Sequence, residues 1–152
     1  MVDPNTFSQN SIDFSGAKGL IFLKDKIILI RRDTKTTSFP LMVDIPGGAR
    51  EISESPFDTF QREVFEELGI QIEKENIIYS KIYPSVIDPE KNRAFFLVTR
   101  ELNINVSDIV FGDEGVEYLL LTPEEYVTLH DGIPGQQKRV ADYLDFLAEQ
   151  NI

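Results

Sequence analysis

The fold is decided by residues 46–70, which read PGGAREISESPFDTFQREVFEELGI. The second half of this stretch predicts a helix. Ser55 is a favoured N-cap residue, and Pro56 suits the first helical position, where a missing N–H group leaves no hydrogen bond unmade. Gly69 suits the left-handed conformation that commonly ends a helix. The stretch therefore predicts a glycine-rich turn followed by a capped helix.

The predicted helix has an apolar face and an acidic face. Its large apolar residues recur at steps of three and four positions, which places them on one side of a helix. They are Phe57, Phe60, Val64 and Leu68. On another side, Glu63, Glu66 and Glu67 lie close enough to repel one another. Clustered hard oxygen ligands are what Mg²⁺ or Mn²⁺ needs, so this face predicts a metal site. An acidic helix surface in plain solvent is the alternative.

The same stretch matches a known motif, the Nudix box, G-x5-E-x7-R-E-U-x-E-E-x-G-U, in which U is a bulky aliphatic residue. The matching residues are Gly48, Glu54, Arg62, Glu63, Val64, Glu66, Glu67, Gly69 and Ile70. Every defined position is filled at the right spacing, and the preceding Pro46-Gly47 looks like the usual lead-in of the family. The chain therefore resembles the Nudix hydrolase superfamily, which includes MutT-like domains.

The resemblance implies the Nudix fold, an α/β (α+β) domain in which a mixed β-sheet is sandwiched between α-helices. The length of 152 residues is enough for one such core. We place the domain at residues 16–152. Residues 1–15 are polar and show no sustained period, so we expect an N-terminal extension that is loosely ordered or forms an edge strand around Phe7 or Ile12.

Apolar runs predict the strands of the sheet. Residues 17–23 and 27–32 flank a short polar turn and predict a hairpin. Both runs are too continuously apolar for a sheet with one wet face, so we expect both faces to be covered. A second antiparallel hairpin is expected over residues 77–84 and 93–102. The other predicted elements are strands over 41–45 and 116–121, a short helix after Thr122, and a final helix with Val140, Tyr143, Leu144 and Leu147 on its apolar stripe.

The resemblance implies hydrolysis of a nucleoside diphosphate linked to another group, with Mg²⁺ or Mn²⁺ as the cofactor. It implies that Glu63, Glu66 and Glu67 are metal ligands. The backbone carbonyl of Gly48 is a further ligand by the same resemblance. Arg62 is expected to orient Glu63.

The general base stays open among several carboxylates. It is a member of the box, or it comes from the loop before strand 116–121, where Nudix members often supply an extra carboxylate. Glu114 and Glu117 are the candidates there, and a solvated acidic loop is the alternative for each. Glu54 either supports the loop before the helix or joins the acidic cluster. His130 is the only histidine and is expected to be structural.

The candidate substrate-binding residues are Arg31, Arg32 and Ile45. In the family, a basic residue at the end of this strand often reaches the phosphate or base of the substrate. Alternation along a strand points Arg31 and Arg32 to opposite faces, so only one of them should reach the substrate, and we prefer Arg32. Ile45 is expected either in the pocket wall or in the ordinary core.

The net charge of −11 argues against binding to a nucleic-acid polymer, which needs clustered Lys and Arg. The expected partner is an anionic, nucleotide-type small molecule, for which the metal must invert the local field. The sequence has neither an apolar run near the length of a membrane span nor the pattern of a secretory signal. The absence of cysteine excludes disulfides and thiolate metal sites. We expect a cytoplasmic protein that is a monomer or a homodimer.

Several functions fit the motif. The first choice is a house-cleaning hydrolase that acts on a (d)NTP or a modified nucleotide, and the alternative substrate is ADP-ribose or a nucleotide sugar. The alternative from another class is a non-catalytic nucleotide-binding Nudix module, which the intact acidic positions of the box disfavour. Pocket walls come from loops outside the box, so the motif does not select the substrate.

Overall fold

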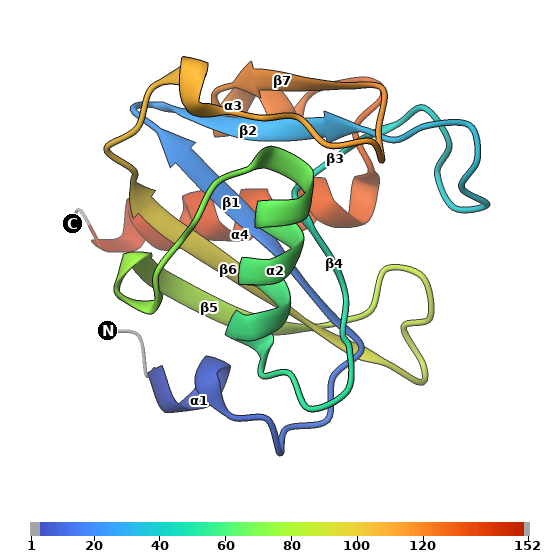
Figure 1. Ribbon diagram of the computed structural model, residues 1–152, viewed down its shortest axis with the longest axis vertical. Coiled ribbons are helices and arrows are strands. Elements are labelled where there is room, and N and C mark those ends of the chain that lie inside the picture. Colours follow the sequence, from blue (N-terminus) through green and yellow to red (C-terminus); the bar gives the residue numbers. More distant parts are fainter. Residues whose placement is uncertain (1–3, 151–152) are drawn as a thin grey trace.

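The computed structural model describes residues 4–150, in which a seven-stranded mixed β-sheet lies between helices (Figure 1). The helices are α1 (Pro4–Ser8), α2 (Pro56–Leu68), α3 (Pro123–Val127) and α4 (Pro134–Gln150), with single 3-10 turns at Lys74–Asn76 and Val106–Asp108. The strands are β1 (Gly16–Leu23), β2 (Lys26–Arg31), β3 (Val43–Asp44), β4 (Gly47–Ala49), β5 (Ile77–Pro84), β6 (Arg93–Glu101) and β7 (Glu117–Leu121). This arrangement confirms the predicted α/β class.

Strand β1 lies at the centre of the sheet. It pairs antiparallel with β2 and β4 and parallel with β6. The path runs β3-β2-β1-β6-β5, and β7 pairs with β2. The β1–β2 and β5–β6 pairs confirm the two predicted hairpins. Because β4 carries the glycine turn and pairs with β1, the centre of the sheet fixes the start of the motif.

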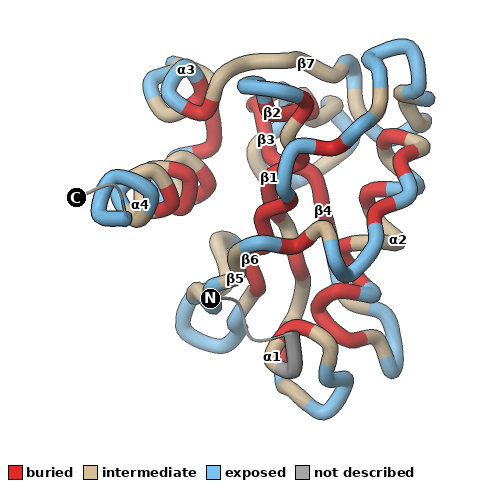
Figure 2. The backbone as a smooth tube through the Cα atoms, turned by 90° about the vertical axis from the view of Figure 1, so that its left-hand side faces the viewer, coloured by how far each residue is buried: buried red, intermediate tan, exposed pale blue. Residues whose placement is uncertain are grey.

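Helices cover both faces of the sheet (Figure 2). On one face, Phe60 and Val64 of α2 are buried in a cluster that also takes Phe7 of α1. On the other face, α3 and α4 bury Tyr126 and Val140 in a second cluster. Strands covered on both sides need apolar residues at every position, which explains the continuous runs in β1 and β2. Within the described residues, no helix combines the length and the apolar character that a membrane span requires.

The N-terminal segment does not form the edge strand around Phe7 that was one of its two expected structures. Residues 4–8 form helix α1, and residues 9–15 belong to no helix or strand. The reason is Phe7, which is buried and packs against Phe57 of α2 with 6.5 Å between the ring centroids. Residues 1–3 of the predicted extension lie outside the described residues, and the domain boundary at residue 16 stays a prediction.

The predicted strand at 41–45 is shorter than expected. Only Val43 and Asp44 pair with β2. Phe39 and Leu41 have positive φ angles of 50° and 61°, which interrupt an extended chain just before the strand. The polar loop therefore reaches further toward the motif than the apolar pattern indicated.

Gly19 allows β1 and β6 to lie unusually close together, and its substitution tests this role. Its N–H donates to the carbonyl of Pro46 at 2.9 Å, and a Cβ at this position would overlap the carbonyl oxygen of Leu97. Gly19→Ala must push the strands apart, so we expect urea denaturation to show a loss of about 3 kcal/mol in unfolding free energy. The control is Ala17→Gly on the same strand, which adds no atom and should lose only about 1 kcal/mol. Equal losses would contradict this reading.

Candidate active site

Helix α2 begins and ends where its capping residues predict. The hydroxyl of Ser55 accepts the N–H of Asp58 at 3.1 Å, and the Asp58 carboxylate accepts the N–H of Ser55 at 3.1 Å. At the other end, Gly69 has a φ of 69° and its N–H donates to the carbonyl of Phe65. The helix that carries the acidic face therefore has two defined ends.

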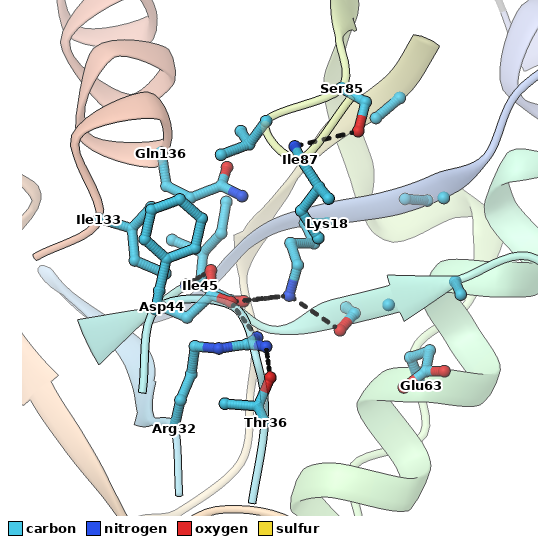
Figure 3. Close-up of a pocket in the computed structure, with 18 of the residues that line it drawn as sticks. Lys18, Arg32, Thr36, Asp44, Ile45, Glu63, Ser85, Ile87, Ile133 and Gln136 are labelled. Carbon is cyan, nitrogen blue, oxygen red and sulfur yellow. Dashed lines mark hydrogen bonds and ion pairs between the residues drawn. The ribbon is translucent and has the colours of Figure 1, made fainter. Parts of the chain in front are cut away.

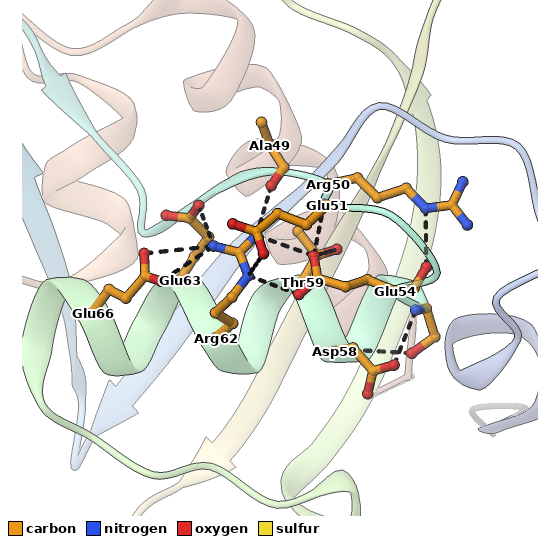
Figure 4. Close-up of polar contacts among 10 residues, drawn as sticks. Ala49, Arg50, Glu51, Glu54, Asp58, Thr59, Arg62, Glu63 and Glu66 are labelled. Carbon is orange, nitrogen blue, oxygen red and sulfur yellow. Dashed lines mark hydrogen bonds and ion pairs between the residues drawn. The ribbon is translucent and has the colours of Figure 1, made fainter.

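Arg62 joins the acidic face to the loop that precedes it (Figure 4). Its Nε donates to the Glu54 carboxylate at 2.7 Å, and its Nη2 donates to the carbonyl of Ala49 at 2.8 Å. Its Nη1 donates to Glu63 at 3.0 Å and lies 3.4 Å from the carboxylate of Glu66. This is the geometry that orientation of Glu63 by Arg62 requires.

The Glu54 carboxylate is fully engaged in holding the loop. Besides Arg62, it accepts the hydroxyl of Thr59 at 2.9 Å and the N–H of Glu51 at 2.8 Å. The hydrogen bonds from Arg62 lower the pKa of Glu54 to about 2. Of the two expectations for Glu54, support of the loop is the one that matches these contacts.

Two of the three clustered carboxylates face a common cavity. The carboxylate of Glu63 lies against the backbone of Gly48, where a Cβ would come within 2.7 Å of both carboxylate oxygens. Glu67 accepts the N–H of Gly47 at 2.8 Å, and both glutamates line the cavity. The side chain of Glu66 is 52% exposed and lies outside the lining.

The donors around Gly48 fit a hard divalent cation. Burial raises the pKa of Glu67 to about 8 and also raises the pKa of Glu63, because their charged forms are poorly solvated. A nearby cation would favour those charged forms. Within residues 4–150, no three acidic or histidine side chains are already arranged to hold a metal. The fit therefore rests on the oxygen donors of the turn and of the helix, which are the kind that Mg²⁺ and Mn²⁺ prefer.

The cavity is about 710 Å³ in volume and runs from the acidic face of α2 to the first turn of α4 (Figure 3). Arg32 and Ile45 line it, whereas Arg31 does not. Arg31 donates to Glu117 and to Asp131, at 2.7 Å in each case, on the other side of the strand. The two arginines point apart as alternation predicts, and only Arg32 is in a position to meet a ligand.

The acidic loop before β7 brings one of its two candidates to the cavity. Glu114 is among the lining residues. Glu117 is the first residue of β7 and is bonded to Arg31 outside that lining. His130 is exposed, and its nearest charged partner is Asp131 at 4.0 Å. Glu114 is therefore the acidic residue of this region that can approach a ligand.

Sequence reasoning missed a charged network on the cavity wall. Asp44 is buried, and its Oδ2 accepts Lys18 Nζ at 3.0 Å and Arg32 Nη1 at 3.1 Å (Figure 3). Lys18 also donates to the carbonyl of Gly47 at 3.1 Å. The available signal was a lysine inside an apolar strand, since a charge at such a position is rarely buried without a partner. Gln136 and Arg139 of α4 also line the cavity, and nothing in their polar segment marked them out.

The sequence matches the family model of the NUDIX domain over residues 15–143. The chain therefore belongs to the NUDIX family. No curated protein matches the sequence. Among solved structures, the MutT protein from Methanosarcina mazei Go1 is similar at 18% identity with a TM-score of 0.67, over 90% of this chain and 96% of that one.

Two further structures have the same fold. An Ap4A hydrolase from C. elegans, solved as a binary complex, is 16% identical with a TM-score of 0.67, over 88% of this chain and 98% of that one. A bifunctional NMN adenylyltransferase/ADP ribose pyrophosphatase from Francisella tularensis is 17% identical with a TM-score of 0.58, over 91% of this chain and 42% of that one. Family and fold together identify the chain as a Nudix-type pyrophosphohydrolase.

The Glu54–Arg62 pair should make stability depend on acid pH. Because the folded-state pKa of Glu54 lies below its usual 4.5, the stabilisation is present above that pH and is lost as the pH falls toward 2. Glu54→Gln should lower the melting temperature by about 5 °C at pH 6, and the difference from the wild type should shrink as the pH falls from 4.5 toward 2. Thermal unfolding followed by circular dichroism in EDTA measures this. Glu51→Gln, which removes an exposed carboxylate 3.5 Å from Arg62, is the control and should give a small gap. If the difference in melting temperature between Glu54→Gln and the wild type is the same at every pH, the Glu54–Arg62 ion pair is not the source of the stabilisation.

Proposed function

We propose that this protein hydrolyses the phosphoanhydride of a nucleoside diphosphate linked to another group, with a (d)NTP or a modified nucleotide as the first choice of substrate. The observation that carries the proposal is the shared cavity. The partly buried carboxylates of Glu63 and Glu67 face it from one side, and Lys18 and Arg32 line it as well. An anionic ligand would find basic groups beside a carboxylate pair that a cation can neutralise.

The proposed cofactor is Mg²⁺ or Mn²⁺. The carbonyl of Gly48 and the carboxylates of Glu63, Glu66 and Glu67 would hold it. When bound, such an ion supplies neutralisation of phosphate oxygens and a lower pKa for a bound water. The F. tularensis structure is described as complexed with AMP and a Mn ion, which supports the same choice here.

The chain's own residues would position the reacting groups. Arg62 fixes the rotamer of Glu63 through the 3.0 Å hydrogen bond and so acts as a positioning residue. The guanidinium of Arg32 is held at the cavity wall by Ser38, Thr36 and Asp44, which leaves donors for an anionic ligand. The proton of the attacking water would pass to a carboxylate at the cavity, either Glu67 or Glu114.

Glu67→Gln tests the proposed role of the box. The substitution nearly keeps the shape of the side chain and removes its charge. Activity at saturating Mg²⁺ should fall at least about 100-fold, as expected for the loss of a principal catalytic group. The measurement is the initial rate of phosphate or pyrophosphate release. Unchanged turnover by a folded variant would exclude Glu67 from the proposed roles.

The two acidic candidates before β7 form a matched pair for a second test. Glu114→Gln should lower kcat about 100-fold if this carboxylate accepts the proton. Glu117→Gln should leave kcat near that of the wild type and lower the melting temperature by about 2 °C, because it only weakens an exposed ion pair with Arg31. Steady-state kinetics and thermal unfolding of both variants decide the matter. A loss of kcat confined to Glu117→Gln would reverse the assignment.

A nucleotide panel with Mg²⁺ and with Mn²⁺ tests the function itself. Nucleoside triphosphates, dinucleoside tetraphosphates, ADP-ribose and a nucleotide sugar should all be included, with product identity as the readout. If ADP-ribose or a nucleotide sugar is turned over fastest, that compound replaces the (d)NTP or modified nucleotide as the proposed substrate. Tight nucleotide binding without any turnover would favour the non-catalytic module. A cytoplasmic location and a monomeric or homodimeric state complete the proposal.

A further inference from the structure

One buried side chain at the start of α4 has hydrogen-bonding capacity that the protein leaves unused. Gln136 is only 4% exposed, and its Oε1 has no hydrogen-bond partner within residues 4–150. The side chain lines the cavity, and Figure 3 shows its amide turned toward the cavity. A buried amide oxygen without a partner costs stability, and a hydrogen-bond donor on a ligand would supply that partner.

The neighbouring residue provides the contrast. Gln137 has the same chemistry, but its Nε2 donates to the carbonyl of Tyr126 at 2.9 Å and to that of Leu129 at 2.7 Å. Its amide therefore ties α3 and the following turn to α4. Of two adjacent glutamines, one stabilises the fold and the other faces the cavity.

A cationic side chain lies one helical turn further along, at Arg139. It is 3% exposed, its Nη2 donates to the carbonyl of Pro84 at 3.0 Å, and its guanidinium lies 5.0 Å from the ring centroid of Tyr83. No carboxylate among the described residues forms an ion pair with it. Because a guanidinium has five N–H donors and this one also lines the cavity, it can donate to acceptors on a ligand.

Part of the wall beside these two side chains is apolar. Ile45 and Ile133 line this end of the cavity, and Phe39 lines it from the loop that has positive φ angles. Apolar walls with a polar edge suit a flat heteroaromatic group better than a sugar or a phosphate, which would leave its polar groups against carbon.

We propose that Gln136 and Arg139 read the edge of a 6-oxopurine base. Such a base presents two adjacent acceptors, N7 and O6, and a guanidinium is the side chain that pairs with both. The neighbouring N1–H is a donor that Gln136 Oε1 can accept. Adenine has an amino donor in place of O6, which would face the donors of Arg139. The inference rests on the proposed function, since it names the base of the nucleotide to be cleaved.

The first measurement is kcat/KM of the wild type for GTP, ITP, 7-deaza-GTP and ATP with Mg²⁺. GTP and ITP should exceed ATP by about 30-fold, the effect of one well-formed bidentate pair. Loss of the N7 acceptor in 7-deaza-GTP should lower the value relative to GTP. Equal values for GTP and ATP, or a preference for ATP, would overturn the proposal.

The second measurement uses the two glutamines as a matched pair. Gln136→Leu should reduce the GTP-to-ATP ratio about 10-fold and leave the melting temperature unchanged or raised, because an unpartnered buried amide is removed. Gln137→Leu should keep the ratio and lower the melting temperature by about 5 °C, because two carbonyls lose their donor. A Gln136→Leu variant that is destabilised and keeps its ratio would show a purely structural glutamine.

Calorimetric binding of GMP and AMP separates this inference from the proposed function. A preference for GMP in a protein that hydrolyses no nucleotide would support the base site while the hydrolase proposal fails. Turnover of nucleotides with no preference among bases would support the hydrolase and overturn the base site. If the protein neither hydrolyses nor binds these nucleotides, both the hydrolase proposal and the base site are overturned.

Discussion

The site depends on the ion pair between Arg62 and Glu54. A helix and the loop before it share no continuous hydrogen-bond ladder, so something must hold one against the other. The guanidinium of Arg62 does so by donating to Glu54, to the carbonyl of Ala49 and to Glu63. Because one planar cation serves all three, the turn that carries Gly48 and the acidic face of α2 keep a fixed relation. Replacement of Arg62 by lysine would keep the positive charge but lose the planar set of N–H donors that contacts all three groups.

A second constraint is electrostatic. The protein carries a net charge of −11, yet its proposed ligand is an anion. The cavity resolves part of this conflict by placing Lys18 and Arg32 around the buried Asp44 on its wall. The rest of the conflict concerns Glu63 and Glu67. Their pKa values are raised because burial leaves the charged carboxylates poorly solvated. A divalent cation would stabilise these carboxylates and attract the phosphates at once.

The sequence predicted those features of the structure that depend on residues close together in the chain. The caps of α2, the two hairpins and the opposite orientations of Arg31 and Arg32 all follow from neighbours in the chain. The parallel pairing of β1 with β6 joins distant segments, and no local pattern records it. The part of the cavity wall outside the motif was missed for the same reason. Lys18, Asp44 and Gln136 come from three separate segments, and only the folded sheet and α4 bring them together.

The central proposition is that the clustered carboxylates of α2 bind a divalent cation beside a phosphoanhydride. Calorimetric titration of the metal-free protein with Mn²⁺ and with Mg²⁺, each alone and with a non-hydrolysable nucleotide, tests it without reference to turnover. The expected result is saturable uptake that tightens when the nucleotide is present, because the phosphates add oxygen ligands. Absence of any Mn²⁺ or Mg²⁺ uptake under both conditions would contradict it.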